Sequence, residues 1–268
     1  MLAVVLAAVL TGCSGVVPTP MPVPSGSPAP ATASGFGLAN PAQELAEFRA
    51  ALAAPAQPFS AVLKVQVTDG TLTVRRQGVV NVSDGLQTAS LSVVSASASV
   101  SASAPAAASA SASASASAPM HQQGETQAYL TITRQATYTR AADHAWVRSP
   151  HPPEPLLTDH RPLAQALLQS DPSSFHGKTK LRTLRGGLGF HLVGRLPRST
   201  VAEALDAAIR EQLAQHQVPD CTTDLLIDAD GRLSELTLTC EANGYQLRST
   251  TTLTEYGPAA ETGPPADL

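Results

Sequence analysis

The sequence predicts an α+β fold, in which one antiparallel sheet packs against a few helices. Runs of alternating apolar and polar residues recur along the chain, and turn-forming pairs separate them. Asp230-Gly231 and Asn243-Gly244 are the strongest of these hairpin signals. Three other segments place apolar residues three or four positions apart, which is the spacing of an amphipathic helix. Because short turns join neighbouring strand patterns, antiparallel pairing is expected.

Composition limits the chain to one modest domain. Its 268 residues include 22 prolines and 18 glycines, while 14% are charged and 4% are aromatic. These proportions are typical of a globular domain diluted by low-complexity segments. The net charge is -4, and the sequence has neither a basic face nor a nucleic-acid-binding motif. Nucleic acid is therefore excluded as an expected partner.

The N-terminal residues resemble a bacterial lipoprotein signal peptide. An apolar run over residues 2–9 leads into Leu10-Thr11-Gly12-Cys13, which matches the lipobox of such leaders. The match implies a signal peptide at residues 1–12, acyl chains on Cys13, and a lipid-anchored protein on the extracytoplasmic face of the cell membrane. The alternative is a buried helix with an incidental cysteine. It is disfavoured because the run is shorter than the roughly 20 residues that span a bilayer and a Pro-rich stretch follows it.

The globular part, residues 39–257, begins with a helix over residues 41–54. Leu45, Phe48 and Leu52 form its apolar stripe. Alternation then predicts strands over residues 61–67, 72–82, 86–94 and 127–133. A short hairpin follows at residues 137–139 and 145–147, and the Pro-rich residues 150–155 end this half of the sheet.

The second half starts with a short helix at residues 162–168 and strands at residues 181–184 and 190–196. Ser199 is predicted to cap one longer helix that ends before Pro219. The apolar stripe of that helix consists of Leu205, Ala208, Ile209 and Leu213. A three-strand meander then closes the domain, over residues 222–228, 232–240 and 245–253.

Three segments lack the composition of a core. Residues 13–38 predict a disordered, semi-extended tether. The Ala-Ser tract predicts a disordered insertion at residues 95–126, and residues 258–268 predict a disordered, frayed tail. The insertion is either a glycosylated or wall-contacting loop or a tolerated repeat expansion. The second is favoured because doubling the length of a loop costs only about 0.6 kcal/mol.

Cys221 and Cys240 are the only cysteines after Cys13, and an exported protein would bridge them. The apolar period on the second strand of their hairpin breaks between Leu233 and Leu236. A one-residue bulge at Ser234-Glu235 explains the break. Pairing then resumes with Cys221 opposite Cys240, close enough for a disulfide. The alternative is two free buried thiols.

No catalytic constellation is present in the sequence. It lacks a Gly-x-Ser-x-Gly elbow and a phosphate-binding loop. The segment that contains Asp228 and Asp230 resembles the start of a calcium-binding loop. The distal glutamate of such a loop is missing, and a hairpin turn explains both acidic residues. His144, His151 and His160 share one loop-rich region, where solvated histidines are favoured over a metal site. The chain is therefore expected to be no enzyme and to hold no cofactor or metal.

The order of the elements resembles the LppX/LprG type of actinobacterial lipoprotein. The hairpin residues Ala136-Thr137-Tyr138 and Ala145-Trp146-Val147 are similar to that family. So are Val193-Gly194-Arg195-Leu196, the Ser199 helix, Leu225-Leu226-Ile227-Asp228-Ala229-Asp230-Gly231-Arg232-Leu233 and Thr252-Leu253-Thr254-Glu255-Tyr256-Gly257. The resemblance implies a LolA-like half-barrel, an open curved antiparallel sheet with helices on its concave face. It also implies that this face binds acyl chains. The Ala-Ser insertion and the cysteine pair depart from the family.

The family resemblance implies binding, and with it transfer, of a lipid or another amphiphile without catalysis. Alternation places twelve apolar side chains on one side of their strands, as candidates for lining a cavity. They are Leu63, Val65, Val67, Leu130, Ile132, Trp146, Phe190, Leu192, Leu225, Leu236, Leu238 and Leu253. The same residues would fill a closed core equally well. A surface-displayed structural or protein-binding lipoprotein with a closed core therefore stays open as the alternative, and the sequence identifies no protein partner.

Overall fold

The computed structural model describes residues 40–97, 125–149, 156–182 and 187–268. The predicted signal peptide, Cys13, the tether, most of the insertion and the Pro-rich residues 150–155 lie outside these residues.

The strands of the first half are β1 (Phe59–Thr68), β2 (Leu72–Ser83), β3 (Leu86–Ser97), β4 (Glu125–Ile132), β5 (Thr137–Ala141) and β6 (Val147–Ser149). Those of the second half are β7 (Phe175–Lys180), β8 (Leu188–Pro197), β9 (Asp220–Asp228), β10 (Leu233–Ala242) and β11 (Tyr245–Gly257). The helices are α2 (Pro41–Ala53), α3 (Arg161–Ser170), α4 (Arg198–Val201) and α5 (Ala207–Gln215), with short 3-10 turns at Pro172–Ser174 and Ala202–Ala204.

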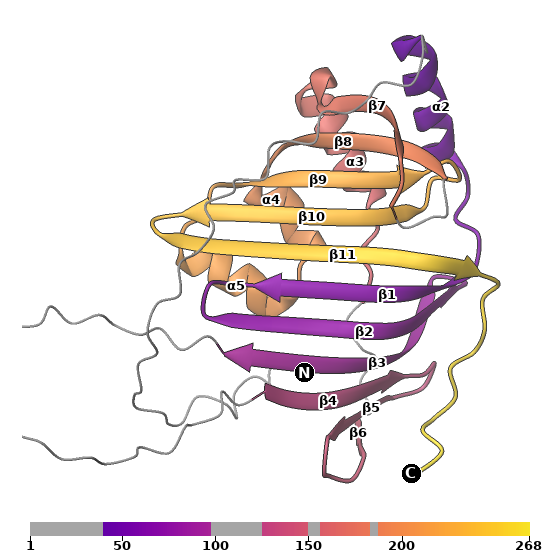
Figure 1. Cartoon of the computed structure of the whole chain (residues 1–268), viewed down its shortest axis with the longest axis vertical. Coiled ribbons are helices and arrows are strands. Elements are labelled where there is room, and N and C mark those ends of the chain that lie inside the picture. Colours follow the sequence, from indigo (N-terminus) through magenta and orange to yellow (C-terminus); the bar gives the residue numbers. More distant parts are fainter. Residues whose placement is uncertain (1–39, 98–124, 150–155, 183–186) are drawn as a thin grey trace, which may run out of the picture.

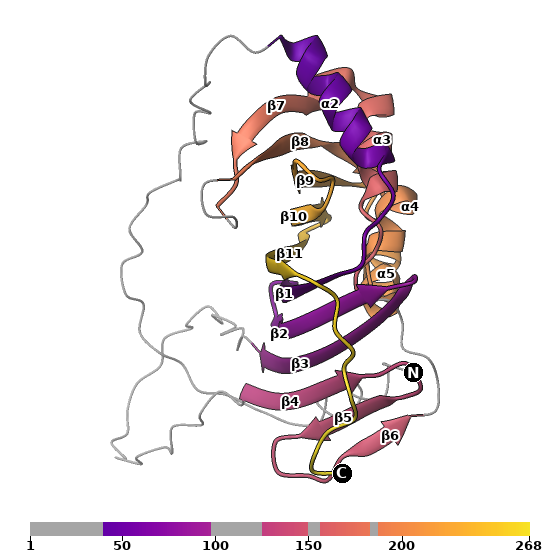
Figure 2. The ribbon, with the colours of Figure 1, turned by 90° about the vertical axis from the view of Figure 1, so that its right-hand side faces the viewer.

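All eleven strands form one antiparallel sheet, in the order β6-β5-β4-β3-β2-β1-β11-β10-β9-β8-β7 (Figure 1). Each half of the chain is a meander of consecutive strands, and β1 joins the two by pairing with β11. Figure 2 shows that the sheet is curved and that the helices lie along its concave side. The predicted α+β class, with a curved open sheet and helices on its concave face, is confirmed.

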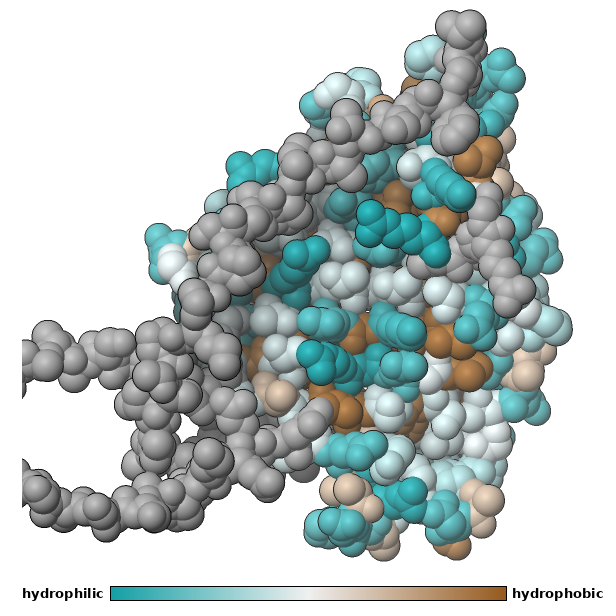
Figure 3. Space-filling model, viewed as in Figure 1, coloured by the Kyte–Doolittle hydropathy of each residue, from teal (hydrophilic) through white to brown (hydrophobic). Residues whose placement is uncertain are grey.

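Alternation along the strands separates an inner face, toward the helices, from an outer face. In β1 the inner side chains Ala61 and Leu63 are buried, whereas the outer side chain Lys64 is exposed. The same pattern continues in β11, where Leu247 and Leu253 are buried and Gln246 is exposed. The outer face is largely polar, with small apolar patches between polar side chains (Figure 3). The hydrophobic core therefore lies between the sheet and the helix layer.

The predicted strand at residues 181–184 was wrong. The strand is β7 (Phe175–Lys180), and residues 183–186 lie outside the described chain. β7 lies at the edge of the sheet and pairs only with β8. Its sequence is Phe-His-Gly-Lys-Thr-Lys, with one large apolar side chain. An edge strand contributes little to the core and needs few apolar residues. The apolar pattern therefore pointed to the buried Leu181 just beyond it.

The single helix predicted after Ser199 is two helices. α4 begins after Pro197, no side-chain cap bonds to it, and Leu205 is extended with φ -120° and ψ 148°. Asp206 then caps α5 by accepting a hydrogen bond from the backbone N–H of Ile209 at 3.0 Å. An aspartate in this position stabilises a new helix start by about 0.5–2 kcal/mol. The apolar spacing continues across this second cap, so the pattern predicts one uninterrupted helix.

The C-terminal residues 258–268 do not form the predicted frayed tail. They cross the ends of β2 to β5 (Figure 2) and make polar contacts with the sheet. The side chain of Asn81 accepts a hydrogen bond from the backbone N–H of Ala260 and donates one to Thr262. Arg134 forms an ion pair with Glu261 at 2.7 Å. Apolar patterning could not predict this segment, because charged and polar groups hold it.

Candidate functional site

The inner face of the sheet is the candidate site, because it gathers nearly all the apolar residues that the sequence singled out. Eleven of the twelve predicted residues belong to one apolar cluster. Nine of them are buried, and Val65 and Val67 are partly buried against the cluster. The alternation argument therefore assigned these eleven side chains to one face.

Trp146 lies elsewhere. It precedes β6 in the turn after β5, and its indole packs against Arg140, whose guanidinium carbon is 4.6 Å from the ring centroid. Its Nε1–H donates to Asp267 at 2.8 Å. The three-residue strand β6 begins only at Val147, so alternation gave no direction for Trp146. The structure does not bring it together with the other candidates.

Helices cover one end of the inner face closely. Phe48 of α2 packs against Phe175 and Phe190, with ring centroids 5.4 and 5.3 Å apart. From α3, Leu163 and Leu167 are buried in the same cluster. Aromatic pairs at such distances contribute about 0.5–1.5 kcal/mol beyond the burial of their area. This end, over β7 to β9, is a packed core.

Burial decreases along one row of cross-strand neighbours. The row runs from β8 to β3 through Leu192, Leu225, Leu236, Thr251, Val65, Arg76 and Val93. The first three side chains are fully or almost fully buried, with 0%, 0% and 7% of their surface exposed. The last four are partly exposed. Along this row the inner face is therefore less covered from β11 to β3 than from β8 to β10. In the neighbouring rows of β1 to β3, Leu63, Val80 and Leu91 are buried.

Arg76 is a charged side chain on this less covered part. Its cross-strand neighbours on the inner face are Val65 and Val93. Its guanidinium bonds the carboxylate of Asp206 at 3.1 Å, and about one fifth of each side chain is exposed. Because Asp206 also caps α5, this ion pair ties the helix to β2. We call Val65, Val67, Val93 and Arg76 the inner-face mouth.

Sequence reasoning missed Arg76. The alternation of β2 places it on the same face as Val74 and Val80, and this signal was readable. A cation on an otherwise apolar face is costly to bury without a partner. No local pattern locates that partner, because Asp206 lies 130 residues further along the chain.

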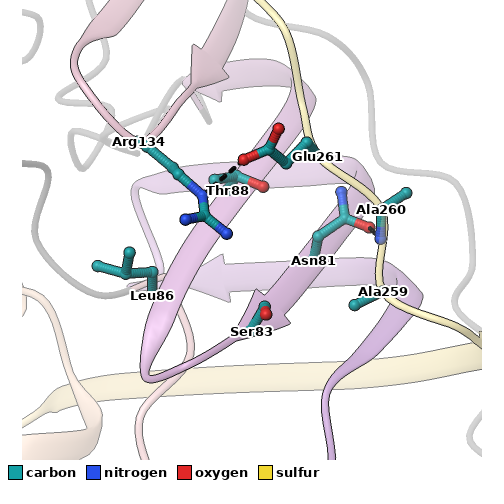
Figure 4. Close-up of a pocket in the computed structure, with 8 residues that line it drawn as sticks. All are labelled: Asn81, Ser83, Leu86, Thr88, Arg134, Ala259, Ala260 and Glu261. Atoms are coloured by element: carbon teal, nitrogen blue, oxygen red, sulfur yellow. Dashed lines mark hydrogen bonds and ion pairs between the residues drawn. The ribbon is translucent and has the colours of Figure 1, made fainter.

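Two surface hollows of the described structure lie away from the inner face. One, of about 210 Å³, lies under the C-terminal segment and is lined by Asn81, Thr88, Arg134 and Glu261 among others (Figure 4). The other, of about 390 Å³, lies beside α4 and the end of α5, next to Pro197 and Pro219. Ligand pockets for small molecules usually measure about 300–1,000 Å³ and are mostly apolar. Of the two hollows, only the one beside α4 and α5 falls within that range of volume.

Several ionisable side chains of the described ranges make local hydrogen bonds and ring contacts. Within the described ranges, no group of three or more His, Cys, Asp or Glu side chains could hold a metal ion. His160 donates to the carbonyl oxygen of Gly231 at 3.0 Å, and burial lowers its pKa. On the outer face, His191 bonds Asp224 at 3.0 Å, and its ring lies 5.4 Å from that of His176. No helix in the described ranges is long and apolar enough to cross a membrane.

Comparison with known proteins gives structural likenesses only. The chain is similar in structure to a bacterial lipoprotein, LppX of Mycobacterium tuberculosis. The likeness covers 83% of this chain and 100% of that one, at 11% identity and a TM-score of 0.41. A β-barrel-like protein of Brucella abortus, with a domain of unknown function, is similar at 8% identity and a TM-score of 0.20. This second likeness covers 78% of this chain and 100% of the Brucella protein. No protein-family model and no curated protein matches the sequence.

Proposed function

We propose that the protein is a lipid-anchored envelope protein that binds a lipid or another amphiphile on the inner face of its sheet, without catalysis. The observation that carries the proposal is the burial gradient from Leu192 to Val93. It leaves an apolar surface incompletely covered beside a cation. An amphiphile, with an apolar chain and a polar group, has the chemistry to match both.

Acyl chains enter at the inner-face mouth, between α5 and β1 to β3. There they replace water around Val65, Val67 and Val93, and burial of each methylene contributes about 0.8 kcal/mol. The Arg76–Asp206 ion pair opens to admit them. Because both side chains are largely buried, the freed charges must then be met by water or by the polar group of the ligand. Anchoring through Cys13 would keep this mouth near a membrane from which to take or return the ligand.

A second function has an observation in its favour. Nine of the twelve candidate residues are already buried by protein. A closed core of this kind would suit a surface-displayed structural or protein-binding module. The two functions differ in one property, which is whether the mouth accepts an apolar chain.

The test is a titration of the purified protein with a fluorescent fatty acid whose emission rises in an apolar site. Val65→Trp adds bulk at the mouth and should weaken binding at least tenfold. Val62→Trp is the matched control, because it lies on the same strand but faces outward. An inner-face site would be contradicted if the wild type and both variants bound the fatty acid equally well. It would also be contradicted if none of the three proteins showed saturable binding, and either result would favour the closed core.

A further inference from the structure

A cation set between two aromatic rings lies on the outer face, on the opposite side of the sheet from the inner-face mouth. Arg140 of β5 pairs across the sheet with Tyr129 of β4. The guanidinium carbon of Arg140 lies 5.1 Å from the ring centroid of Tyr129 and 4.6 Å from that of Trp146. Cation–π contacts at these distances hold a guanidinium in a fixed orientation. We call Tyr129, Arg140 and Trp146 the aromatic clamp.

The aromatic clamp holds a carboxylate. Nη1 of Arg140 donates to Oδ2 of Asp267, and Nε1 of Trp146 donates to Oδ1 of the same side chain at 2.8 Å. Both carboxylate oxygens are thus bound, one by a donor from β5 and the other by a donor from the turn that follows it. Charge-assisted hydrogen bonds of this kind are roughly twice as strong as neutral ones. The hydrogen bond from Trp146 is the largest influence that lowers the pKa of Asp267, and the charge of Arg140 acts in the same direction.

We propose that the aromatic clamp is a binding site for an acidic, proline-containing extended segment of a partner protein. In this molecule residues 258–268 occupy the site in cis. The resident segment has the required chemistry, since Pro264 and Pro265 lie just before Asp267. Prolines favour an extended backbone and reduce the entropy lost on binding.

Two observations indicate that the resident segment can be replaced. The side chain of Asp267 is 59% exposed, and that of Glu261 in the same segment is 72% exposed. In addition, Nε of Arg140 is buried without an acceptor in the described part of the chain. A partner that also satisfies this donor would gain a hydrogen bond that the resident segment does not make.

The test uses the full-length protein and a labelled peptide with the sequence of residues 259–268. Trp146 is the only tryptophan of the chain, so its emission reports on the clamp directly. Asp267→Lys removes both carboxylate contacts, so it should release the end of the resident segment from the clamp and shift the Trp146 emission. The variant should then bind the peptide at least tenfold more tightly than wild type, whose tethered segment competes at a high effective concentration.

Three controls make the result specific. A peptide with Asn at the position of Asp267 should bind at least tenfold more weakly to the Asp267→Lys protein. Adding Arg140→Gln to that protein should abolish binding of the unmodified peptide. Asp230→Asn removes another exposed acid, the partner of Arg232, and should behave as wild type. An unchanged Trp146 emission in a folded Asp267→Lys protein, or no binding of the peptide to it, would overturn the proposal.

Discussion

Cys221 of β9 and Cys240 of β10 lie directly opposite each other, with Cα atoms 4.3 Å apart and their sulfurs joined. The pairing depends on a bulge between Leu233 and Glu235. Without the extra residue, the two cysteines would fall on opposite faces of the sheet. Both are buried on the inner face, so the disulfide fixes the register of the hairpin from inside the core.

Loss of this disulfide should destabilise the domain. Replacing both cysteines with alanine is expected to lower the free energy of unfolding by about 2–4 kcal/mol, because the cross-link restricts the unfolded chain. Urea unfolding of the variant and the wild type measures the difference. Intact mass with and without reductant checks the bond itself, and two alkylatable thiols in the non-reduced protein would contradict it.

Gly231 is predicted to be irreplaceable in the turn between β9 and β10. It has φ +77°, and a Cβ there would lie 2.2 Å from the carbonyl oxygen of Ala51 in α2. Gly231→Ala should cost about 1–2 kcal/mol for the left-handed backbone, plus about 1–3 kcal/mol for the steric clash. Gly244→Ala is the matched control, because Gly244 has φ +80° and open space around it. Equal losses of stability in the two variants would show that α2 does not press on this turn.

His160 should make the stability of the domain depend on pH. Burial lowers its pKa, so the folded state keeps the ring neutral while it donates to Gly231. Below the ordinary histidine pKa of about 6.5, the unfolded chain takes up a proton that the folded chain does not. Stability should therefore fall as pH drops from about 6.5 toward the lowered pKa. Urea midpoints at pH 7.5 and 5.5 should differ more for wild type than for His160→Gln, and an equal difference would contradict this role.

The lipid anchor at Cys13 stays a prediction, and processing in cells tests it. Cys13→Ala should release the protein from the membrane fraction or leave an unprocessed precursor, because acylation is the expected attachment. Fractionation and the mass of the N-terminal peptide provide the measurement. A variant that is processed and retained like wild type would rule out Cys13 as the anchor.

Local signals in the sequence predicted most of the fold. Asp230-Gly231 and Asn243-Gly244 located the final meander, and the break at Leu233 located its bulge. Side-chain alternation assigned eleven of the twelve candidates to one apolar cluster. Each of these features depends on residues close together in the chain, where period and turn chemistry are informative.

The features that escaped prediction depend on contacts between distant residues. β7 is defined by pairing with β8 at the edge of the sheet rather than by its own apolar pattern. Arg76 meets Asp206 across 130 residues, and Arg140 meets Asp267 across 127. Such polar pairs follow from the three-dimensional course of the chain, so a sequence pattern does not reveal them.

The central claim, that the inner face binds an amphiphile, is tested most directly by native mass spectrometry of the protein purified from the cells that produce it. The account predicts an added mass that organic extraction removes and that is absent from Val65→Trp. Val62→Trp should retain it. A wild-type protein that carries only its own mass, and takes up no added fatty acid under the same conditions, would contradict the account.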